Sequence, residues 1–137
     1  MGRILGIDYG KKWIGIAISD PLKVIANPLK EINLEEKNIL EEIDKILKEF
    51  EIEKIIIGLP LTMSGKEIEM CEEIKKFKKE IEEKFKIETI LWDERFTTKI
   101  VKDLKKESHK NAAAVLLQDY LNSLKIKNDN SFTGKCI

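Results

Sequence analysis

Cysteine is scarce in this sequence of 137 residues, and the two that it has, Cys71 and Cys136, stand far apart. They form neither a CxxC pair nor an evenly spaced set, which excludes a disulfide framework and indicates a reducing compartment. Long hydrophobic runs are missing too, since no stretch approaches the roughly 18 apolar residues of a membrane span. The first predicted strand begins almost at Met1 and leaves no room for a signal peptide, so we expect a cytoplasmic protein.

An excess of charge of either sign is also absent, because 25 basic residues balance 25 acidic ones. A nucleic acid or an acidic lipid would have to be held by a local patch, since no net charge attracts it. Arginine occurs only as Arg3 and Arg95, and histidine only as His109. A surplus of Lys and Glu with little Gln is typical of heat-loving organisms. Against that background the rare residue types are candidates for function.

The first predicted feature is a β-hairpin. Two apolar runs punctuated by glycine, 3–8 and 13–19, stand on either side of the segment 9–12, Tyr-Gly-Lys-Lys. This pattern is typical of two antiparallel strands, with Gly10 in the turn at a positive φ. The hairpin places the first strand of the sheet at the very start of the chain.

Strand and helix patterns alternate after the hairpin. Apolar residues spaced by three and four predict helices, whereas a β-branched run without alternation predicts a strand covered on both faces. Pro28 confines the third strand to an edge or to an irregular position. The predicted elements are a strand over 24–32, a helix over 34–50, a strand over 54–58, a helix over 66–86, a strand over 88–92, a short helix from Thr97 or Thr98 to about 106, and a last helix from 108 to about 124.

This order of elements, β-β-β-α-β-α-β-α-α, predicts an α/β protein with a five-stranded mixed sheet and flanking helices. The first half of the sheet is expected to be antiparallel and the second half parallel. The ribonuclease H-like fold is the leading candidate, and the nucleotide-binding domains of sugar kinases and actin-like ATPases share its core. We expect a single domain over residues 1–125 and a flexible C-terminal tail over 126–137.

Carboxylates stand where two of the predicted parallel strands end. Functional groups in mixed sheets gather beyond the carboxyl ends of such strands. Asp8 ends the first strand and shares strand parity with Gly6, which predicts that its carboxylate leaves the sheet on a half-buried face. A buried, unpaired carboxylate is costly, so Asp8 requires a cation, backbone donors or a metal as its partner. Asp93 and Glu94, here called the acidic pair, follow the strand over 88–92 and reach the same edge.

His109 is a third candidate ligand, at the start of the last helix. It shares a helical face with Ala113 and is therefore expected to face the sheet. We expect Asp8, His109 and one member of the acidic pair to surround a site for Mg²⁺ or Mn²⁺, since hard cations choose carboxylate oxygen and Mn²⁺ also accepts imidazole. Two such metals about 4 Å apart activate a water and stabilise the leaving oxygen of a phosphodiester.

Each candidate also has a purely structural interpretation, which the sequence leaves open. Asp8 would then cap the hairpin turn, and the acidic pair would form ion pairs with Arg95 and Lys99 in a solvated loop. His109 would be a helix-start residue bonded to the backbone.

Four motifs, in their order and spacing, resemble the YqgF family, also called RuvX or Holliday-junction-resolvase-like proteins: GIDYGKKWIGIAISDP, IIIGLPLTMSGKE, DERFTT and AAAVLLQDYL. The resemblance covers residues 3–124. It implies a ribonuclease H-like fold, an acidic metal site of the RuvC type, and a nuclease that acts on structured nucleic acid, usually in processing the 5′ end of pre-16S ribosomal RNA.

The resemblance also assigns residues. Asp8 matches the aspartate of the family's DYG motif, and Asp93 and Glu94 match its DER acidic pair. The family usually carries an aspartate where this chain has His109. A neutral imidazole binds Mn²⁺ or relays a proton, but one negative charge fewer implies a lower affinity for Mg²⁺.

The sequence therefore predicts a metal-dependent phosphodiester hydrolase of ribosomal RNA maturation. The catalytic and metal-binding residues are expected to be Asp8, Asp93, Glu94 and His109. Arg95 is expected to hold a scissile-strand phosphate by bidentate contact, within a local substrate-binding rim formed by Lys11, Lys12, Thr97 and Lys99.

Three alternatives stay open. Branched DNA is the alternative substrate of the same nuclease. A turn like Asp8-Tyr-Gly-Lys-Lys also resembles the phosphate-binding hairpin of actin-like ATPases, although those proteins clamp a nucleotide between two domains and this chain has the length of one. A non-catalytic RNA-binding assembly factor with the same fold is the third, and His109 in place of a carboxylate favours it.

Overall fold

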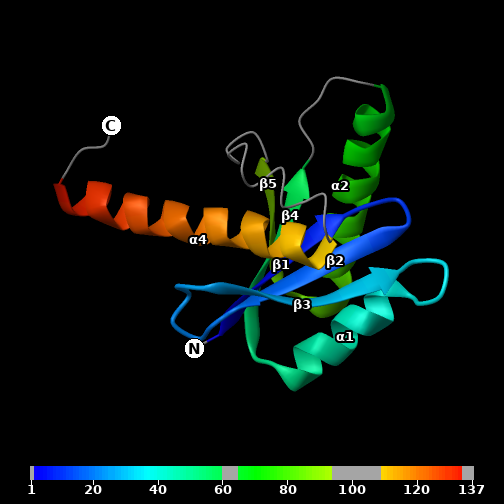
Figure 1. Cartoon of the computed structure of the whole chain (residues 1–137), viewed down its shortest axis with the longest axis horizontal. Coiled ribbons are helices and arrows are strands. Elements are labelled where there is room, and N and C mark those ends of the chain that lie inside the picture. Colours follow the sequence, from blue (N-terminus) through cyan, green and yellow to red (C-terminus); the bar gives the residue numbers. More distant parts are fainter. Residues whose placement is uncertain (1, 60–64, 94–108, 134–137) are drawn as a thin grey trace.

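A computed structural model describes residues 2–59, 65–93 and 109–133 of the chain (Figure 1). Its strands form one five-stranded sheet in the order β3-β2-β1-β4-β5. The β1–β2 and β2–β3 pairs are antiparallel, whereas the β1–β4 and β4–β5 pairs are parallel, which confirms the predicted mixed sheet. The described elements are β1 (Arg3–Tyr9), β2 (Trp13–Ser19), β3 (Ala26–Asn33), α1 (Ile39–Glu49), β4 (Ile52–Leu59), α2 (Gly65–Phe85), β5 (Glu88–Asp93) and α4 (His109–Thr133).

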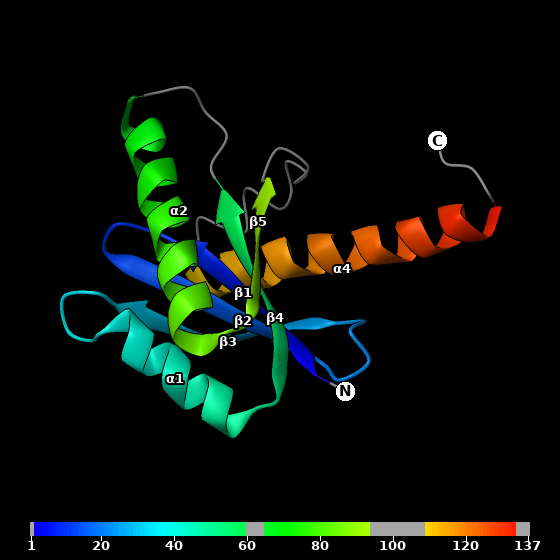
Figure 2. The same cartoon turned by 180° about the vertical axis from the view of Figure 1, so that it is seen from behind.

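Helices cover both faces of this sheet. Figure 2 shows α1 and α2 on one face, and Figure 1 shows α4 crossing the other. Both faces of the central strands are therefore apolar, which explains the unbroken run of isoleucines at 55–57 in β4. The core under α1 and α2 includes Leu5, Ile7, Ile57, Ile74 and Phe77, and the core under α4 includes Ile4, Ala17, Ile56, Leu117 and Leu121.

The hairpin between β1 and β2 forms as predicted, but the role predicted for Gly10 is wrong. Its backbone does not adopt a positive φ; a Cβ atom at this position would lie 2.5 Å from the carbonyl oxygen of Trp13. The turn requires glycine because the chain approaches itself too closely for any side chain. The local sequence pattern predicts a glycine in the turn, but it does not tell whether the glycine is needed for a positive φ or for a close approach of the backbone.

The helix predicted over 34–50 begins later, at Ile39, so its predicted start is wrong. Asn38 is the N-cap residue, and its Oδ1 atom accepts hydrogen bonds from the backbone N–H groups of Leu40 at 2.9 Å and Glu41 at 3.2 Å. These bonds satisfy donors that a helix leaves unpaired in its first turn, so the helix begins after the asparagine rather than at the first apolar residue.

The third strand, β3, lies at an edge of the sheet, as Pro28 predicts. The register between β2 and β3 shifts where Ala17 pairs with Pro28, after the pair of Ile16 with Lys30. Proline lacks the N–H that a regular ladder would use, and both an edge and an irregularity accommodate that loss.

The last helix, α4, continues to Thr133, so the prediction that it ends near residue 124 is wrong. Figure 1 shows its later part extending beyond the sheet. After His109 the sequence contains no proline, and its first glycine is Gly134, so neither of the two strongest helix breakers precedes Thr133. Flexibility of the C-terminal segment stays a prediction. The short helix predicted to end near residue 106 lies outside the described residues, and none of the described helices is long and apolar enough to cross a membrane.

Candidate functional site

The carboxyl ends of the parallel strands β1, β4 and β5 lie together at one end of the sheet (Figure 1). The register pairs Leu59 of β4 with Asp93 of β5. On the other side of β4, Ile7 pairs with Ile57. Asp8 therefore lies within one residue of the level of Asp93. Only β4 separates the two strands, so the backbones at Asp8 and Asp93 are two strand spacings apart, about 10 Å.

Asp8 is half-buried, as its strand parity predicts, and lies on the face that α4 covers. A Cβ atom on Gly6 would lie 2.8 Å from the Cβ of Leu117 and 3.3 Å from the carbonyl oxygen of Ala113, so this residue of β1 faces α4. Alternate residues of a strand point to the same side. Asp8, two residues after Gly6, consequently shares the α4 face of the sheet.

The direction of α4 brings its first turn to the same end of β1. Tyr120 accepts a hydrogen bond of 3.3 Å from Lys54 Nζ, and Lys54 pairs with Ile4 near the start of β1. Ala113 lies further along β1, and His109 is one helical turn before Ala113. The helix therefore begins at the end of β1 that carries the aspartate (Figure 1). His109 is the first residue of α4, so its predicted place at the start of the last helix is confirmed, whereas its side chain is outside the described part of the chain.

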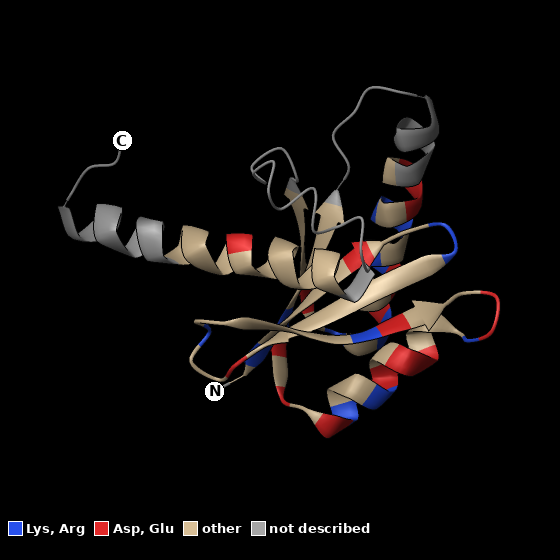
Figure 3. Ribbon diagram, in the orientation of Figure 1, with Lys and Arg blue, Asp and Glu red and all other residues tan. Residues whose placement is uncertain are grey.

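The remaining predicted residues divide into two groups. Lys11 and Lys12 lie in the exposed hairpin turn that follows β1, visible as the blue tip between β1 and β2 in Figure 3. Lys12 Nζ lies 3.9 Å from Glu35 Oε2, and with 60% and 70% of their side chains exposed this ion pair contributes little. The second group lies outside the described residues and consists of Glu94, Arg95, Thr97 and Lys99, with the side chain of Asp93.

No group of three or more His, Cys, Asp or Glu side chains with the geometry of a metal site occurs within the described ranges. Of the four predicted ligands, these ranges include the side chain of Asp8 alone. The carboxylate oxygens of Asp8 suit a hard divalent cation, so the donor chemistry present at this edge fits Mg²⁺ or Mn²⁺.

Tyr9 follows Asp8 but points to the other face of the sheet. Its ring packs on Phe77 of α2, with centroids 5.1 Å apart and planes tilted by 48°. Burial, and then the negative charges of Glu73 and Glu80, raise the pKa of the Tyr9 hydroxyl. The hydroxyl stays protonated at neutral pH, and the packing of the ring on Phe77 holds the end of β1 against α2.

Two polar links between α4 and the sheet were missed by sequence reasoning. Trp92 Nε1 donates a hydrogen bond of 3.0 Å to Asp119 Oδ2. Gln118 Oε1 accepts from the backbone N–H of Ala26 at 2.9 Å, and its Nε2 donates to the carbonyl oxygen of Val24 at 2.9 Å. The sequence signal for these links was a glutamine and an aspartate that directly follow an apolar helical run. This glutamine is the only glutamine in the sequence.

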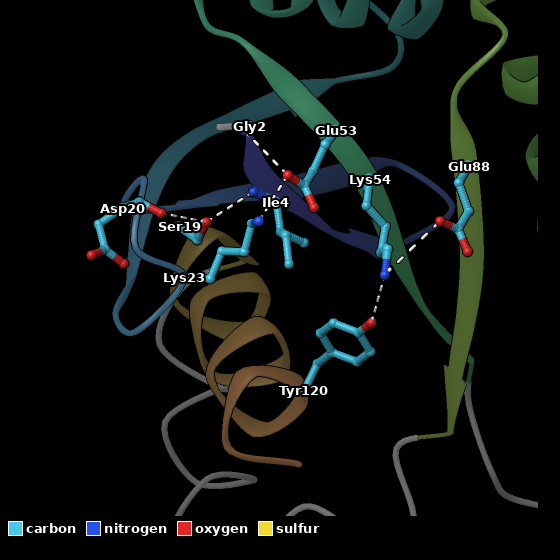
Figure 4. A network of polar contacts seen from close by, with 9 residues as sticks. All are labelled: Gly2, Ile4, Ser19, Asp20, Lys23, Glu53, Lys54, Glu88 and Tyr120. Carbon is cyan, nitrogen blue, oxygen red and sulfur yellow. Dashed lines mark hydrogen bonds and ion pairs between the residues drawn. The ribbon is translucent and has the colours of Figure 1, made fainter. Parts of the chain in front are cut away.

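A separate polar network closes the opposite end of the sheet (Figure 4). Ser19 Oγ accepts a hydrogen bond of 2.8 Å from the Ile4 backbone N–H. Glu53 accepts from the Gly2 backbone N–H at 3.2 Å and pairs with Lys23 Nζ at 2.8 Å. The bond from Lys23 is the main cause that lowers the pKa of the Glu53 carboxyl below its ordinary value. These contacts fix the start of the chain, and they lie at the end of the sheet opposite to Asp8.

Solved structures identify the class of fold. RuvC of T. thermophilus, in complex with a Holliday junction substrate, matches with a TM-score of 0.62 and 10% identity, over 92% of this chain and 96% of that chain. The Fowlpox virus resolvase, in complex with Holliday junction DNA, matches with a TM-score of 0.50 and 12% identity, over 92% of this chain and 97% of that chain. At such identities the likeness shows the fold alone, which is the predicted ribonuclease H-like fold.

Sequence relatives identify the family. The family model described as "RuvX: Holliday junction resolvase" matches residues 2–123. A protein of Caldicellulosiruptor bescii is 40% identical, over 87% of this chain and 95% of its own length. A protein of Sulfurihydrogenibium sp. is 41% identical, over 94% and 96%. Both carry the name "Putative pre-16S rRNA nuclease". The chain belongs to the RuvX family, as its motifs predict.

Proposed function

We propose that this protein is a divalent-metal-dependent nuclease of the RuvX type that processes the 5′ end of pre-16S ribosomal RNA in the cytoplasm. The observation that carries the proposal is the position of Asp8. This half-buried carboxylate ends β1, stands within one residue of the level of Asp93, and lies on the face where α4 begins. The names of the relatives support the reaction and the substrate.

The proposed metal centre combines Asp8 with the acidic pair and His109. Trp92 of β5 packs under α4, on the face that carries Asp8, and Glu94 shares its strand parity, so Glu94 is the member of the acidic pair proposed to share a cation with Asp8. When bound, Mg²⁺ or Mn²⁺ supplies Lewis acidity for the attack of water on a phosphodiester. The chain itself orients the carboxylates: Asp8 is held by a central strand whose two neighbours are both hydrogen-bonded to it.

The proposed substrate surface surrounds that centre. Lys11 and Lys12 are exposed on the hairpin that follows Asp8 (Figure 3). Arg95, with Thr97 and Lys99 near it in the sequence, follows the acidic pair and would hold a phosphate of the scissile strand. A local rim of this kind attracts nucleic acid although the net charge of the chain is zero.

One specific observation favours a second candidate function, a non-catalytic RNA-binding assembly factor. His109 replaces the aspartate that the family usually carries, so the site has one carboxylate fewer. A protein of this kind would bind precursor RNA through the same surface without cleaving it.

The substitution Asp8→Asn tests the proposal. It removes a negative charge while preserving the size of the side chain, so the melting temperature should stay constant or rise slightly. Cleavage of a pre-16S leader RNA in the presence of Mn²⁺ should fall by at least roughly 100-fold, because even residues that only support metal ligands cost 10- to 100-fold. The matched control is Asp44→Asn, which removes a partly exposed carboxylate that pairs with Lys48 on α1.

Three results would change the assignment. Equal cleavage by wild type and Asp8→Asn at saturating Mn²⁺ would remove Asp8 from the catalytic set. Tight RNA binding by the wild type without cleavage would support the assembly factor. Faster cleavage of a four-way DNA junction than of the leader RNA would identify branched DNA as the substrate.

A further inference from the structure

Three consecutive residues of α4 connect this helix to three different strands. Gln118 bonds the backbone at the start of β3, at 2.9 Å to the Ala26 N–H. Asp119 accepts the 3.0 Å hydrogen bond from Trp92 of β5, and Tyr120 accepts the 3.3 Å bond from Lys54 of β4. Since β3 and β5 are the two edge strands, one turn of α4 is tied to both edges of the sheet and to its interior.

The contact with β5 is the one that bears on the site. Trp92 packs among the apolar residues under α4, and its ring meets that of Tyr120 edge-on, with centroids 5.2 Å apart and planes at 86°. Trp92 directly precedes the acidic pair and pairs in register with Gly58 of β4. The contacts of the indole therefore fix a residue of β5 that directly precedes the acidic pair.

An edge strand needs such a support more than a central strand does. β1, which carries Asp8, is hydrogen-bonded on both sides, whereas among the described strands β5 pairs with β4 alone. A hydrogen bond to an ionised acceptor is shorter and about twice as strong as a neutral one, so the carboxylate of Asp119 is well suited to hold the indole N–H. The turn that carries Asp119 is also bonded to β4, the neighbour of β5, through the contact of Tyr120 with Lys54.

We propose that Asp119 is a positioning residue of the metal centre: acting through Trp92, it holds the end of β5 so that the acidic pair reaches the same cation as Asp8. The inference rests on the proposed function. Displacements of about 1 Å in such a centre reduce rates by up to about 100-fold, so one hydrogen bond at this place affects activity well beyond its contribution to stability.

The test compares the loss of the hydrogen bond between α4 and β5 with the loss of the hydrogen bonds that Gln118 of α4 makes at the start of β3. Asp119→Ala should weaken the binding of Mn²⁺ to the nucleic-acid-free protein, measured by calorimetry, roughly tenfold, and lower kcat for the leader RNA by a similar factor with KM unchanged. Gln118→Ala is the matched control: it removes hydrogen bonds from the adjacent residue of the same helix, but at the edge remote from the acidic pair. It should lower the melting temperature and leave Mn²⁺ affinity and kcat at the wild-type level.

Two further variants separate positioning from folding. Asp119→Asn keeps an oxygen that accepts from the indole and should recover most of the lost Mn²⁺ affinity. Trp92→Phe removes the N–H but keeps a ring, and should reproduce the effect of Asp119→Ala. The double variant should lose no more than either single one, because both remove the same hydrogen bond. If Asp119→Ala fails to fold, these two substitutions carry the test.

The outcomes distinguish this inference from the proposed function. A fall in melting temperature with wild-type Mn²⁺ affinity and kcat in Asp119→Ala or Trp92→Phe would make the bond purely structural and overturn the inference, while an active wild type would still support the nuclease. A wild-type protein that neither binds Mn²⁺ nor cleaves RNA would overturn both.

Discussion

Gly6 of β1 and Leu117 of α4 are in such close contact that a Cβ atom on the glycine would lie 2.8 Å from the Cβ of the leucine. Real Cβ atoms do not approach so closely, so α4 lies at this distance from the sheet only because residue 6 has no side chain. Gly6 lies two residues before Asp8 in β1, and Leu117 lies one helical turn after Ala113 in α4. The contact between Gly6 and Leu117 therefore sets how closely the start of α4 approaches the carboxyl end of β1, where the metal centre is proposed.

Gly6→Ala should destabilise the fold, because neither the strand nor the helix can yield without shifting packed neighbours. The expected loss in the free energy of unfolding is about 1–3 kcal/mol, measured by urea denaturation. Leu117→Ala should cost about 2–5 kcal/mol through the cavity that it leaves, but it keeps the Cβ that would meet residue 6. In a Leu117→Gly background, which removes that Cβ, Gly6→Ala should cost less than it does in the wild type. An equal cost in both backgrounds would show that the clash with Leu117 is not the cause.

Glu42 should make stability depend on pH. Its buried carboxylate receives hydrogen bonds from Lys45 Nζ at 3.1 Å and Lys30 Nζ at 3.4 Å, and these, the bond from Lys45 above all, lower the pKa of the Glu42 carboxyl. A pKa lowered by folding stabilises the protein above the unfolded-state value of about 4.3 and ceases to do so as the pH falls through the folded-state pKa.

Glu42→Gln should therefore be less stable than the wild type at pH 6, and the difference should shrink as the pH falls below about 4.3. Urea denaturation at several pH values measures it. Asp44→Asn, whose side chain on the same helix is 40% exposed, is the control and should show a smaller effect. A difference between Glu42→Gln and the wild type that does not change with pH would contradict the assigned ion pairs.

Arg95→Lys should weaken binding of the leader RNA about tenfold in Kd, or about 1.4 kcal/mol, because lysine retains the charge but loses the planar fork that matches a phosphate. The control is Arg3→Lys, which changes the chain's other arginine. Arg3 Nη1 donates to the Ser19 carbonyl oxygen at 3.2 Å, at the far end of β1, so its replacement should leave RNA binding unchanged. A fall of several degrees in melting temperature with unchanged RNA affinity would assign Arg95 to a structural ion pair with the acidic pair.

His109→Asp should tighten Mg²⁺ binding and raise cleavage supported by Mg²⁺, roughly tenfold, because a hard cation prefers carboxylate to imidazole. It should also flatten any rise in activity between about pH 6 and 7.5, where a histidine of reference pKa ~6.5 loses its proton. His109→Asn, the control, should flatten the pH profile without tightening Mg²⁺ binding. Unchanged metal affinity, rate and pH profile in His109→Asp would place the residue outside the site and favour the assembly factor.

The local features of this protein could be predicted from its sequence. Apolar spacings locate the strands and helices, Pro28 assigns β3 to an edge, and strand parity puts Asp8 on a half-buried face. Each of these properties depends on residues close together in the chain. Apart from the conformation of Gly10, the errors concern element ends: the asparagine cap that delays α1 to Ile39 competes with the apolar pattern, and α4 continues to Thr133, beyond its apolar pattern.

The approach of α4 to the sheet was decided by the tertiary structure. The sequence contains Gly6, Trp92 and the turn of residues 118–120, but nothing in their local patterns indicates that they meet. Contacts of this kind join residues separated by 27 to 111 positions, from the Trp92–Asp119 bond to the approach of Gly6 to Leu117. They form only when strand order, register and helix direction are all established, because packing against a sheet depends on shape and on bonds across elements rather than on the periodicity of any one of them.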